Sequence, residues 1–192
     1  MKSRLHLNKR GIRVLGVAES FREGRAYSII SGVAMRGDLV TDGFAFGRTT
    51  VGGDDATSQI AALYRKLHRN DLNLVMLSGC IISKYNIVDV DGLSKKVGRP
   101  VVCLTYNETS GIESAIKKRF PSSEEKIVAY RRLGGRSQVK LSSGHRVFVR
   151  TSNMSEEEAG EVLNMFTLQG SIPEPVRVAR LLARAVSALS SR

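Results

Sequence analysis

The chain has 192 residues, 42% of them hydrophobic, and a formal net charge of +12. This length suits one compact domain over residues 1–192. The sequence has no apolar run of about 18 residues and no signal-peptide core, which argues against a membrane-spanning or secreted protein. We therefore expect a cytoplasmic protein. The excess of Lys and Arg favours a polyanion such as DNA or RNA as partner, with a generally basic surface as the alternative.

The first third of the chain has the pattern of three antiparallel strands. A buried strand is expected over residues 12–18, closed by Glu19, and a second strand over residues 26–35. A tight turn at residues 36–38 leads to a third strand over residues 39–46, where apolar residues fall roughly on alternate positions. The sequence therefore predicts that a small antiparallel sheet opens the fold.

The apolar period then changes to that of a helix followed by two buried strands. Asp55 or Thr57 can cap a helix with one apolar face. Continuous apolar runs over residues 72–77 and 101–104 are typical of strands buried on both faces, with a short helix over residues 91–97 between them. Strand, helix and strand of this length predict parallel pairing through a right-handed crossover.

The second half of the chain is mainly helical. Capping-box patterns begin at three serines, Ser110, Ser122 and Ser155. Residues 137–141 and 146–149 form a candidate hairpin between these helices. The last helix is expected to begin at Pro173-Glu174-Pro175, because proline is preorganised for a first helical turn.

Cys80 and Cys103 each lie at or in an apolar, strand-like run. Two isolated thiols without nearby histidines have no recognisable metal spacing. We interpret both as small buried hydrophobic residues of a reducing compartment, and we expect neither a disulfide nor a metal pair.

Four acidic residues are candidates to meet at the carboxyl edge of the sheet: Glu19, Asp54, Asp55 and Asp89. We take Glu19, Asp55 and Asp89 as candidate catalytic residues, and Glu19 and Asp55 as candidate ligands of Mg²⁺ or Mn²⁺. The segment Gly52-Gly53-Asp54-Asp55 also matches a nucleotide-cyclase signature superficially. We prefer a structural role for it, as the end of a strand and the cap of a helix, where acids suit the helix dipole.

Basic residues form two groups that can contact phosphates, one within residues 117–136 and one on the last helix. The candidate nucleic-acid-binding residues are Lys84, Asn86, Arg177, Arg180 and Arg184. The three arginines share one helix face, and the alternative is a solvated face on which Arg177 pairs with Glu174. Because only 6% of the residues are aromatic and none is tryptophan, base stacking is not expected to dominate binding.

Several segments together resemble an archaeal uncharacterised family, the domain of unknown function ninety-nine, which is similar to endonuclease V. They are Arg13-Val14-Leu15-Gly16-Val17, Thr50-Val51-Gly52-Gly53-Asp54-Asp55-Ala56-Thr57, Tyr85-Asn86-Ile87-Val88-Asp89 and Gly170-Ser171-Ile172-Pro173-Glu174-Pro175-Val176-Arg177-Val178-Ala179. The resemblance spans nearly the whole chain. It implies an α/β, ribonuclease-H-like fold, a mixed sheet of three antiparallel and then two parallel strands flanked by helices, in an archaeal cytoplasmic protein.

The chain departs from the pattern of this family at the positions that carry its chemistry. The first strand of the family usually ends in Asp-Asp, where this chain has Ala18 and Glu19. Ser78 takes the place of a metal-binding aspartate of endonuclease V, and Arg180 takes that of a histidine in the last helix. A Val-Asp-Gly segment is replaced by Val51-Gly52-Gly53. Glu19 can substitute for the lost carboxylate only if the strand ends at Ala18, since alternation otherwise turns its side chain to the opposite face.

Three functions are consistent with these features. The favoured one is an endonuclease-V-like protein that binds nucleic acid and whose endonuclease activity is lost or altered, because it explains both the charge and the missing carboxylates. The second is a divergent Mg²⁺- or Mn²⁺-dependent endonuclease that uses Glu19, Asp55 and Asp89. The third is a non-enzymatic module whose basic surface binds an acidic protein.

Overall fold

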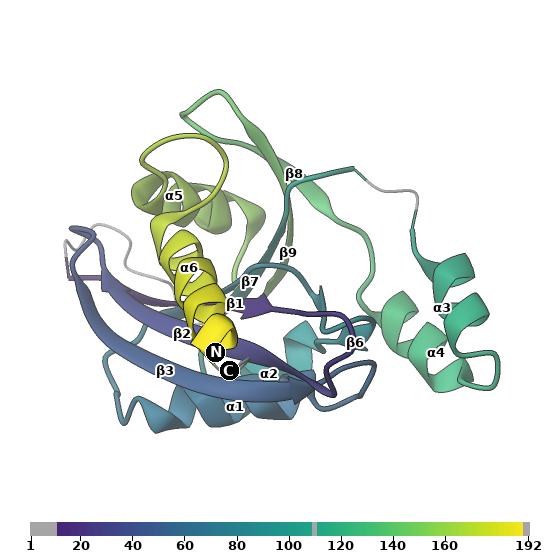
Figure 1. The fold of residues 1–192 in the computed structure, drawn as a ribbon. Helices are drawn as coiled ribbons and strands as arrows, with labels where there is room; N and C mark the ends of the chain where they lie inside the picture. Colours follow the sequence, from purple (N-terminus) through teal and green to yellow (C-terminus); the bar gives the residue numbers. More distant parts are fainter. Residues whose placement is uncertain (1–10, 109–110, 190–192) are drawn as a thin grey trace.

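The computed structural model describes residues 11–108 and 111–189. A seven-stranded mixed sheet forms its centre, with the strand order β3-β2-β1-β4-β7-β9-β8 (Figure 1). Its strands are β1 (Arg13–Ser20), β2 (Tyr27–Arg36), β3 (Thr41–Thr50), β4 (Leu74–Leu77), β7 (Val101–Thr105), β8 (Ser137–Lys140) and β9 (Arg146–Ser152). A separate short hairpin pairs β5 (Ile81–Ile82) with β6 (Asn86–Ile87).

Strand directions confirm the predicted ribonuclease-H-like order. Strand β1 pairs antiparallel with β2 and parallel with β4, and β4 pairs parallel with β7. The candidate hairpin at residues 137–149 forms as β8 and β9, and β9 also pairs antiparallel with β7. The hairpin therefore widens the sheet beyond the five strands that the sequence predicted.

Helices lie on both faces of the sheet (Figure 1). α1 (Ala56–Lys66) and α2 (Val90–Val97) cover one face, and α5 (Glu156–Phe166) and α6 (Glu174–Leu189) cover the other. α3 (Glu113–Arg119) and α4 (Glu124–Arg132) stand beside the sheet as a helical pair. No helix of the described residues has the length and apolar character to cross a membrane.

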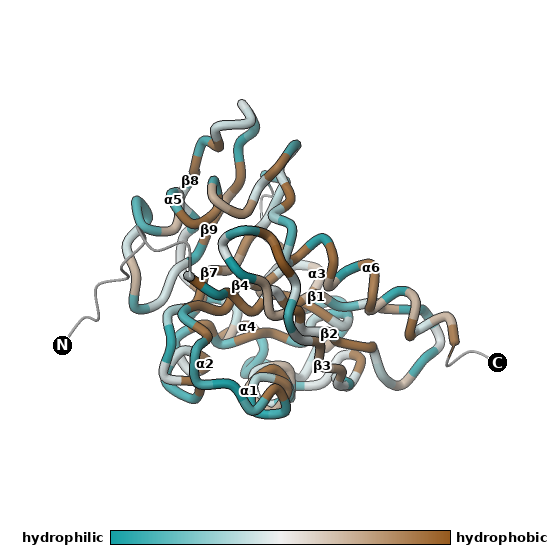
Figure 2. Tube along the Cα trace, turned by 90° about the vertical axis from the view of Figure 1, so that its left-hand side faces the viewer, coloured by the Kyte–Doolittle hydropathy of each residue, from teal (hydrophilic) through white to brown (hydrophobic). Residues whose placement is uncertain are grey.

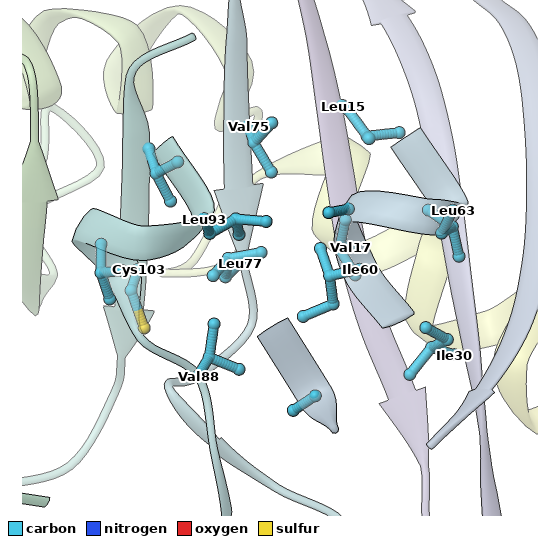
Figure 3. Close-up of a cluster of buried hydrophobic side chains, with 14 of the residues drawn as sticks. Leu15, Val17, Ile30, Ile60, Leu63, Val75, Leu77, Val88, Leu93 and Cys103 are labelled. Atoms are coloured by element: carbon cyan, nitrogen blue, oxygen red, sulfur yellow. The ribbon is translucent and has the colours of Figure 1, made fainter. Parts of the chain in front are cut away.

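The core has one layer on each face of the sheet because side chains alternate along β1. Leu15 and Val17 pack with Leu63 of α1, whereas Val14 and Ala18 pack on the side of α5 and α6. Figure 3 shows the first of these layers, and Figure 2 shows the hydrophobic residues that run through β1, β4 and β7. Full burial of one such side chain stabilises the fold by roughly 1.5–3 kcal/mol.

α6 starts where the sequence predicted it and lies directly against β1. A Cβ atom at Gly16 would come 2.4 Å from the carbonyl carbon of Pro175, so only glycine permits this approach. Ser31 of β2 donates a hydrogen bond to the carbonyl oxygen of Ala179. The close contact fixes the position of α6, and with it the position of Arg180 at the tip of β4.

Several local predictions need correction. The capping box at Ser155 is present, but α4 has Ser123 as its N-cap without a side-chain cap bond, one residue after Ser122. Ser110 lies outside the described residues, and α3 begins later than its pattern predicted, with Ile112 as N-cap. Strand β1 runs on to Ser20 instead of ending at residue 18.

Candidate functional site

A cavity of about 570 Å³ opens at the carboxyl ends of β1, β4 and β7. The hairpin β5–β6, α4, α6 and the β8–β9 region complete its walls. Among the residues that the structure describes, its charged lining consists of Lys84, Arg136, Arg150 and Arg180, together with one acid, Glu19. We call this cavity the strand-end pocket. Its excess of cations over carboxylates suits a phosphate ligand.

Arg180 reaches from α6 to the tip of β4. Its Nη2 donates to Oγ of Ser78 over 2.7 Å, and its guanidinium carbon lies 5.5 Å from the ring centroid of Tyr106. Burial raises the pKa of Tyr106, and the neighbouring charge of Arg180 partly opposes this rise. Tyr106 therefore stays neutral near pH 7, and the tip of β4 presents a cation and a hydroxyl rather than a carboxylate.

Two further arginines line the strand-end pocket beyond β7. Arg136 donates to the carbonyl oxygen of Asn107 over 3.1 Å and stacks on Phe148. Arg150 donates through Nε to the carbonyl oxygen of Leu133 over 3.0 Å. Burial lowers the pKa of Arg150, and the nearby charge of Arg136 lowers it further. Like charges held this close favour an anionic ligand between or beside them.

Lys84 enters the pocket from an unusual turn. Ser83, Lys84 and Tyr85 have φ angles of 46°, 57° and 70°, so three consecutive non-glycine residues occupy the left-handed region. Each such residue costs roughly 1–2 kcal/mol, so the turn needs support from its surroundings. The side chain of Lys84 pairs with Glu23 and lies 5.7 Å from the ring centroid of Phe21.

Glu19 supplies part of that support. Both of its carboxylate oxygens lie 2.8 Å from the backbone nitrogen of Ser83, and Oε2 accepts a further hydrogen bond from Oγ of Ser83. Because β1 continues to Ser20, Glu19 and Ala18 point to opposite faces of the strand. Glu19 therefore holds the turn and does not replace the missing carboxylate at Ala18.

Asp55 and Asn86 form a second support for the same hairpin. Oδ1 of Asp55 accepts from the backbone nitrogen of Thr50 over 3.1 Å and from Nδ2 of Asn86 over 2.6 Å. Burial alone would raise the pKa of Asp55, but these hydrogen bonds more than offset it and leave the pKa below its ordinary value. Asn86 is fully buried, and its Oδ1 accepts from the backbone nitrogen of Ala56. Both side chains thus point into the fold.

The remaining candidates are dispersed. Asp89 is the N-cap of α2 and accepts from the backbone nitrogen of Gly92. Arg177 pairs with Glu174, as the structural alternative predicted, through Nε over 2.9 Å. Arg184 is exposed on α6. Of the five candidate nucleic-acid-binding residues, Lys84 and Arg180 line the strand-end pocket, and the other three do not.

The donor set does not fit the Mg²⁺ or Mn²⁺ site that the resemblance implies. Across residues 11–108 and 111–189, no three His, Cys, Asp or Glu side chains gather closely enough to hold a metal ion. Glu19 and Asp55 each bind their own backbone and side-chain donors. Arg180 stands at the strand tip where a carboxylate would be needed, and a cation there repels a metal ion.

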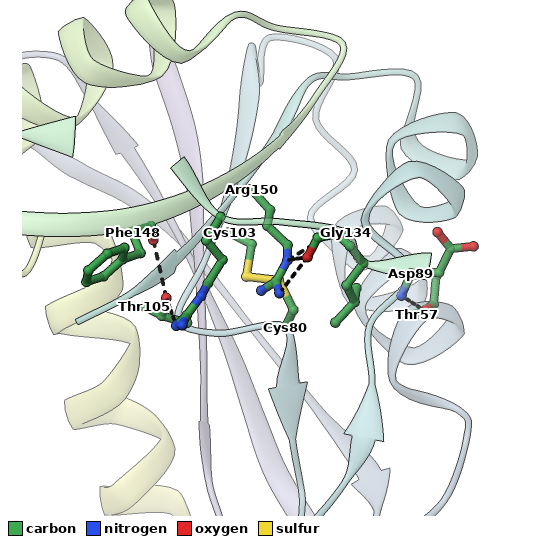
Figure 4. The surroundings of a disulfide bond; sticks show 10 residues. Thr57, Cys80, Asp89, Cys103, Thr105, Gly134, Phe148 and Arg150 are labelled. Atoms are coloured by element: carbon green, nitrogen blue, oxygen red, sulfur yellow. Dashed lines mark hydrogen bonds between the residues drawn. A yellow bond between two sulfur atoms is a disulfide. The ribbon is translucent and has the colours of Figure 1, made fainter. Parts of the chain in front are cut away.

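Cys80 and Cys103 correct another expectation, because they form a disulfide (Figure 4). The first follows β4 and the second lies within β7, so the bond ties the segment that leads to β5 onto the sheet. Arg150 lies opposite Cys103 in the β7–β9 register and beside this bond in Figure 4. The expectation of two free thiols was wrong because parallel pairing of β4 with β7 brings residues 23 positions apart together.

Sequence reasoning missed three residues that shape the pocket, Ser83, Tyr106 and Arg150. Tyr106 directly follows the second buried strand, so the rule that ligands meet strand ends could have found it. Arg150 extends the predicted hairpin strand by one position. Ser83 carried no local signal, since its role depends on Glu19, which is 64 positions away.

Comparisons with known proteins place the sequence in a family. A family model described as endonuclease dU matches residues 10–187. A UPF0215 protein of Pyrobaculum aerophilum is 38% identical over 172 residues, which cover 89% of this chain and 92% of that protein.

Two solved structures share the fold. A protein of unknown function from Archaeoglobus fulgidus has a TM-score of 0.76 at 21% identity, covering 91% of this chain and 98% of that one. Endonuclease V of Ciona intestinalis, in complex with a 24mer DNA containing an inosine followed by a ribo-adenosine, has a TM-score of 0.60 at 15% identity, covering 93% and 87%. At these identities the likeness establishes a ribonuclease-H-like fold similar to that of endonuclease V.

Proposed function

The chain belongs to the endonuclease dU family, and from this premise and its pocket we propose that it binds nucleic acid through phosphate groups, with endonuclease activity lost or altered. The observation that carries the proposal is the position of Arg180. Its guanidinium lies at the tip of β4, bonded to Ser78, where a metal-dependent nuclease of this fold needs a carboxylate. A guanidinium binds phosphate directly and in a fixed geometry.

The composition of the pocket supports the same proposal. Lys84, Arg136, Arg150 and Arg180 outnumber the one acid, Glu19, which is bonded to Ser83. A phosphodiester in the pocket replaces the water around these cations and releases counterions from the nucleic acid. The net charge of +12 brings the polyanion towards the protein over longer distances.

A salt titration with a matched variant tests phosphate binding. Binding of labelled single- and double-stranded DNA and RNA is measured at increasing salt for the wild type, Arg180→Ala and Arg65→Ala. Arg65 is exposed on α1, on the opposite face of the sheet from α6, and its loss changes the charge equally. We expect Arg180→Ala to weaken binding about tenfold and to lower the salt slope by about one, with little effect of Arg65→Ala.

Equal effects of the two variants would show that binding follows net charge alone and would contradict the pocket. Affinity that does not fall as salt rises would contradict phosphate binding of any kind.

The family description favours a second candidate, a divergent Mg²⁺- or Mn²⁺-dependent endonuclease. Glu19, Asp55 and Asp89 are the catalytic residues that the sequence offers for it. Its test is incubation with deoxyuridine- and inosine-containing DNA and RNA in the presence of Mg²⁺ or Mn²⁺. Because the acids are engaged within the fold, we expect no cleavage. Cleavage that disappears in Glu19→Gln, while the variant keeps its fold, would establish the second candidate instead.

A further inference from the structure

A row of exposed side chains runs along the outer strand of the sheet, and none of these residues lines the strand-end pocket. In the register, Phe44 of β3 lies opposite Val33 and Phe46 lies opposite Ser31. Directly opposed residues share a face of the sheet, and Ser31 bonds to Ala179 of α6, so both rings lie on the face that carries α6. α6 packs on β1 and β2, while β3 forms the edge beside it (Figure 1).

The same row continues with a cation and a third ring. Arg48 follows Phe46 by two positions and is exposed, and Tyr27 of β2 lies opposite Thr50, one further step along. Phe44, Phe46 and Tyr27 are 53%, 39% and 56% exposed. Neighbouring members on β3 are about 7 Å apart, because two residues of a strand span twice its rise. We call Tyr27, Phe44, Phe46 and Arg48 the aromatic row.

From this arrangement we propose that single-stranded nucleic acid binds along β3, with bases stacked on Phe44 and Phe46 and a phosphate at Arg48. Flat rings on an open sheet face accept any base, and a cation next to them suits the backbone of an extended strand. The aromatic row is a second site, separate from the strand-end pocket, and it does not rest on the function proposed for that pocket.

Charge favours a nucleic acid over a second copy of the chain as occupant of the row. A protein with a net charge of +12 repels its own copies, and Arg48 on each copy would add to this repulsion. The same charge attracts a polyanion. The low aromatic content of the chain does not oppose stacking, because the fold gathers three of its rings at one place.

The absence of tryptophan from the chain gives a direct test. Phe46→Trp places a single indole in the aromatic row, and Leu168→Trp places one at an exposed position in the α5–α6 connection. Single-stranded oligothymidylate is titrated into each, alongside an abasic oligomer of equal length and charge. We expect the oligothymidylate to quench the fluorescence of Phe46→Trp, and we expect no quenching by the abasic oligomer or in Leu168→Trp.

Two double variants separate stacking from an apolar contact. Phe44→Leu/Phe46→Leu keeps the apolar surface and removes both rings, whereas Phe44→Tyr/Phe46→Tyr keeps the rings. We expect the leucine variant to bind oligothymidylate about 10- to 100-fold more weakly and the tyrosine variant to bind as the wild type does. Adding Arg180→Ala to Phe46→Trp separates the aromatic row from the pocket, because we expect bases still to quench the fluorescence when Arg180 is removed.

Three results would overturn the proposal. They are equal quenching by the abasic oligomer, unchanged affinity of the leucine variant, and a concentration-dependent dimer in light scattering that Phe44→Ser/Phe46→Ser abolishes. The last result would assign the aromatic row to self-association. Failure of the salt titration for Arg180→Ala, with quenching intact, would count against the pocket alone.

Discussion

The two ends of the central sheet both carry arginines, but they use them differently. At the amino end of β1, Arg13 and Arg69 pair with Asp42 and Asp71 at distances of 2.7–3.3 Å. The hydrogen bond from Arg69 lowers the pKa of Asp71 to about 2, so the carboxylate of Asp71 stays ionised well below neutral pH. Its charges are balanced, two against two, and its role is structural.

At the carboxyl end the arginines have no such balance. Arg180 bonds to a serine hydroxyl and Arg150 to backbone carbonyls, and neither forms a salt bridge with a carboxylate of the described residues. Partly buried cations held in this way lower the stability of the folded state, since backbone groups compensate a charge less well than a carboxylate does. Such a loss of stability is typical of a functional site. The amino end of the sheet shows that the same fold can also hold arginines in balanced salt bridges.

The largest expected effect comes from breaking the carboxyl end without changing any charge. The double variant Cys80→Ser/Cys103→Ser removes the disulfide and opens a loop of 23 residues in the unfolded state. We expect the free energy of unfolding to fall by about 3 kcal/mol, measured by denaturant titration without reductant. Thiol labelling of the denatured wild type provides the control, and two reactive thiols before reduction would show that the bond is absent.

A smaller effect is expected at Asp55, which supports the hairpin of the pocket. Asp55→Asn removes the charge that accepts hydrogen bonds from Thr50 and Asn86, and should destabilise the fold by about 2 kcal/mol near pH 7. The folded-state pKa is lowered, so this stabilisation is fully present above the ordinary value of 3.8 and is lost as the pH falls below it.

Thermal melts of wild type and Asp55→Asn at several pH values measure this dependence. The difference in Tm should shrink as the medium becomes more acidic than pH 3.8. A difference that stays constant down to low pH would mean that shape, and not the charge of Asp55, supports the hairpin.

Replacing one arginine at each end of the sheet tests the difference between the two ends directly. Arg69→Ala should lower the free energy of unfolding by about 1 kcal/mol and leave nucleic-acid affinity unchanged, because Arg69 bonds Asp42 and Asp71. Arg180→Ala should leave stability nearly unchanged and weaken binding. Unfolding titrations and binding isotherms on the same two proteins measure both quantities, and the same pattern of effects in both variants would remove the distinction.

Local features of the sequence predicted much of the fold. The runs over residues 72–77 and 101–104 identified β4 and β7 because strands buried on both faces are apolar throughout. The Pro173-Glu174-Pro175 segment located the start of α6. The Arg177–Glu174 pair, which was the alternative to phosphate binding by Arg177, followed from helix spacing. These predictions are confirmed because each depends on residues within a few positions of one another.

The candidate site was harder to predict because its contacts span long distances along the chain. The Glu19–Ser83 bond joins residues 64 positions apart, and the Arg180–Ser78 bond joins residues 102 positions apart. Glu19 was interpreted as a metal ligand because acids at strand ends are typical metal ligands. Strand β1, however, extends two residues further than its apolar run, so Glu19 lies within the strand. Polar residues inside the hairpin, such as Asn86, likewise gave no signal of their burial.

The smallest expected effect is also the one that separates the proposed functions most clearly. Glu19→Gln keeps an oxygen to accept from Ser83 and removes the only negative charge that the described residues place in the lining of the strand-end pocket. If the pocket binds phosphate, loss of this charge should strengthen binding of DNA or RNA about threefold at low salt in variant protein that keeps its fold. A metal-dependent nuclease predicts the opposite, because it would lose a ligand and its activity. Binding isotherms and cleavage assays on this one variant therefore distinguish the two functions: a phosphate pocket predicts stronger binding, and a nuclease predicts loss of cleavage. Weaker binding would contradict the phosphate pocket.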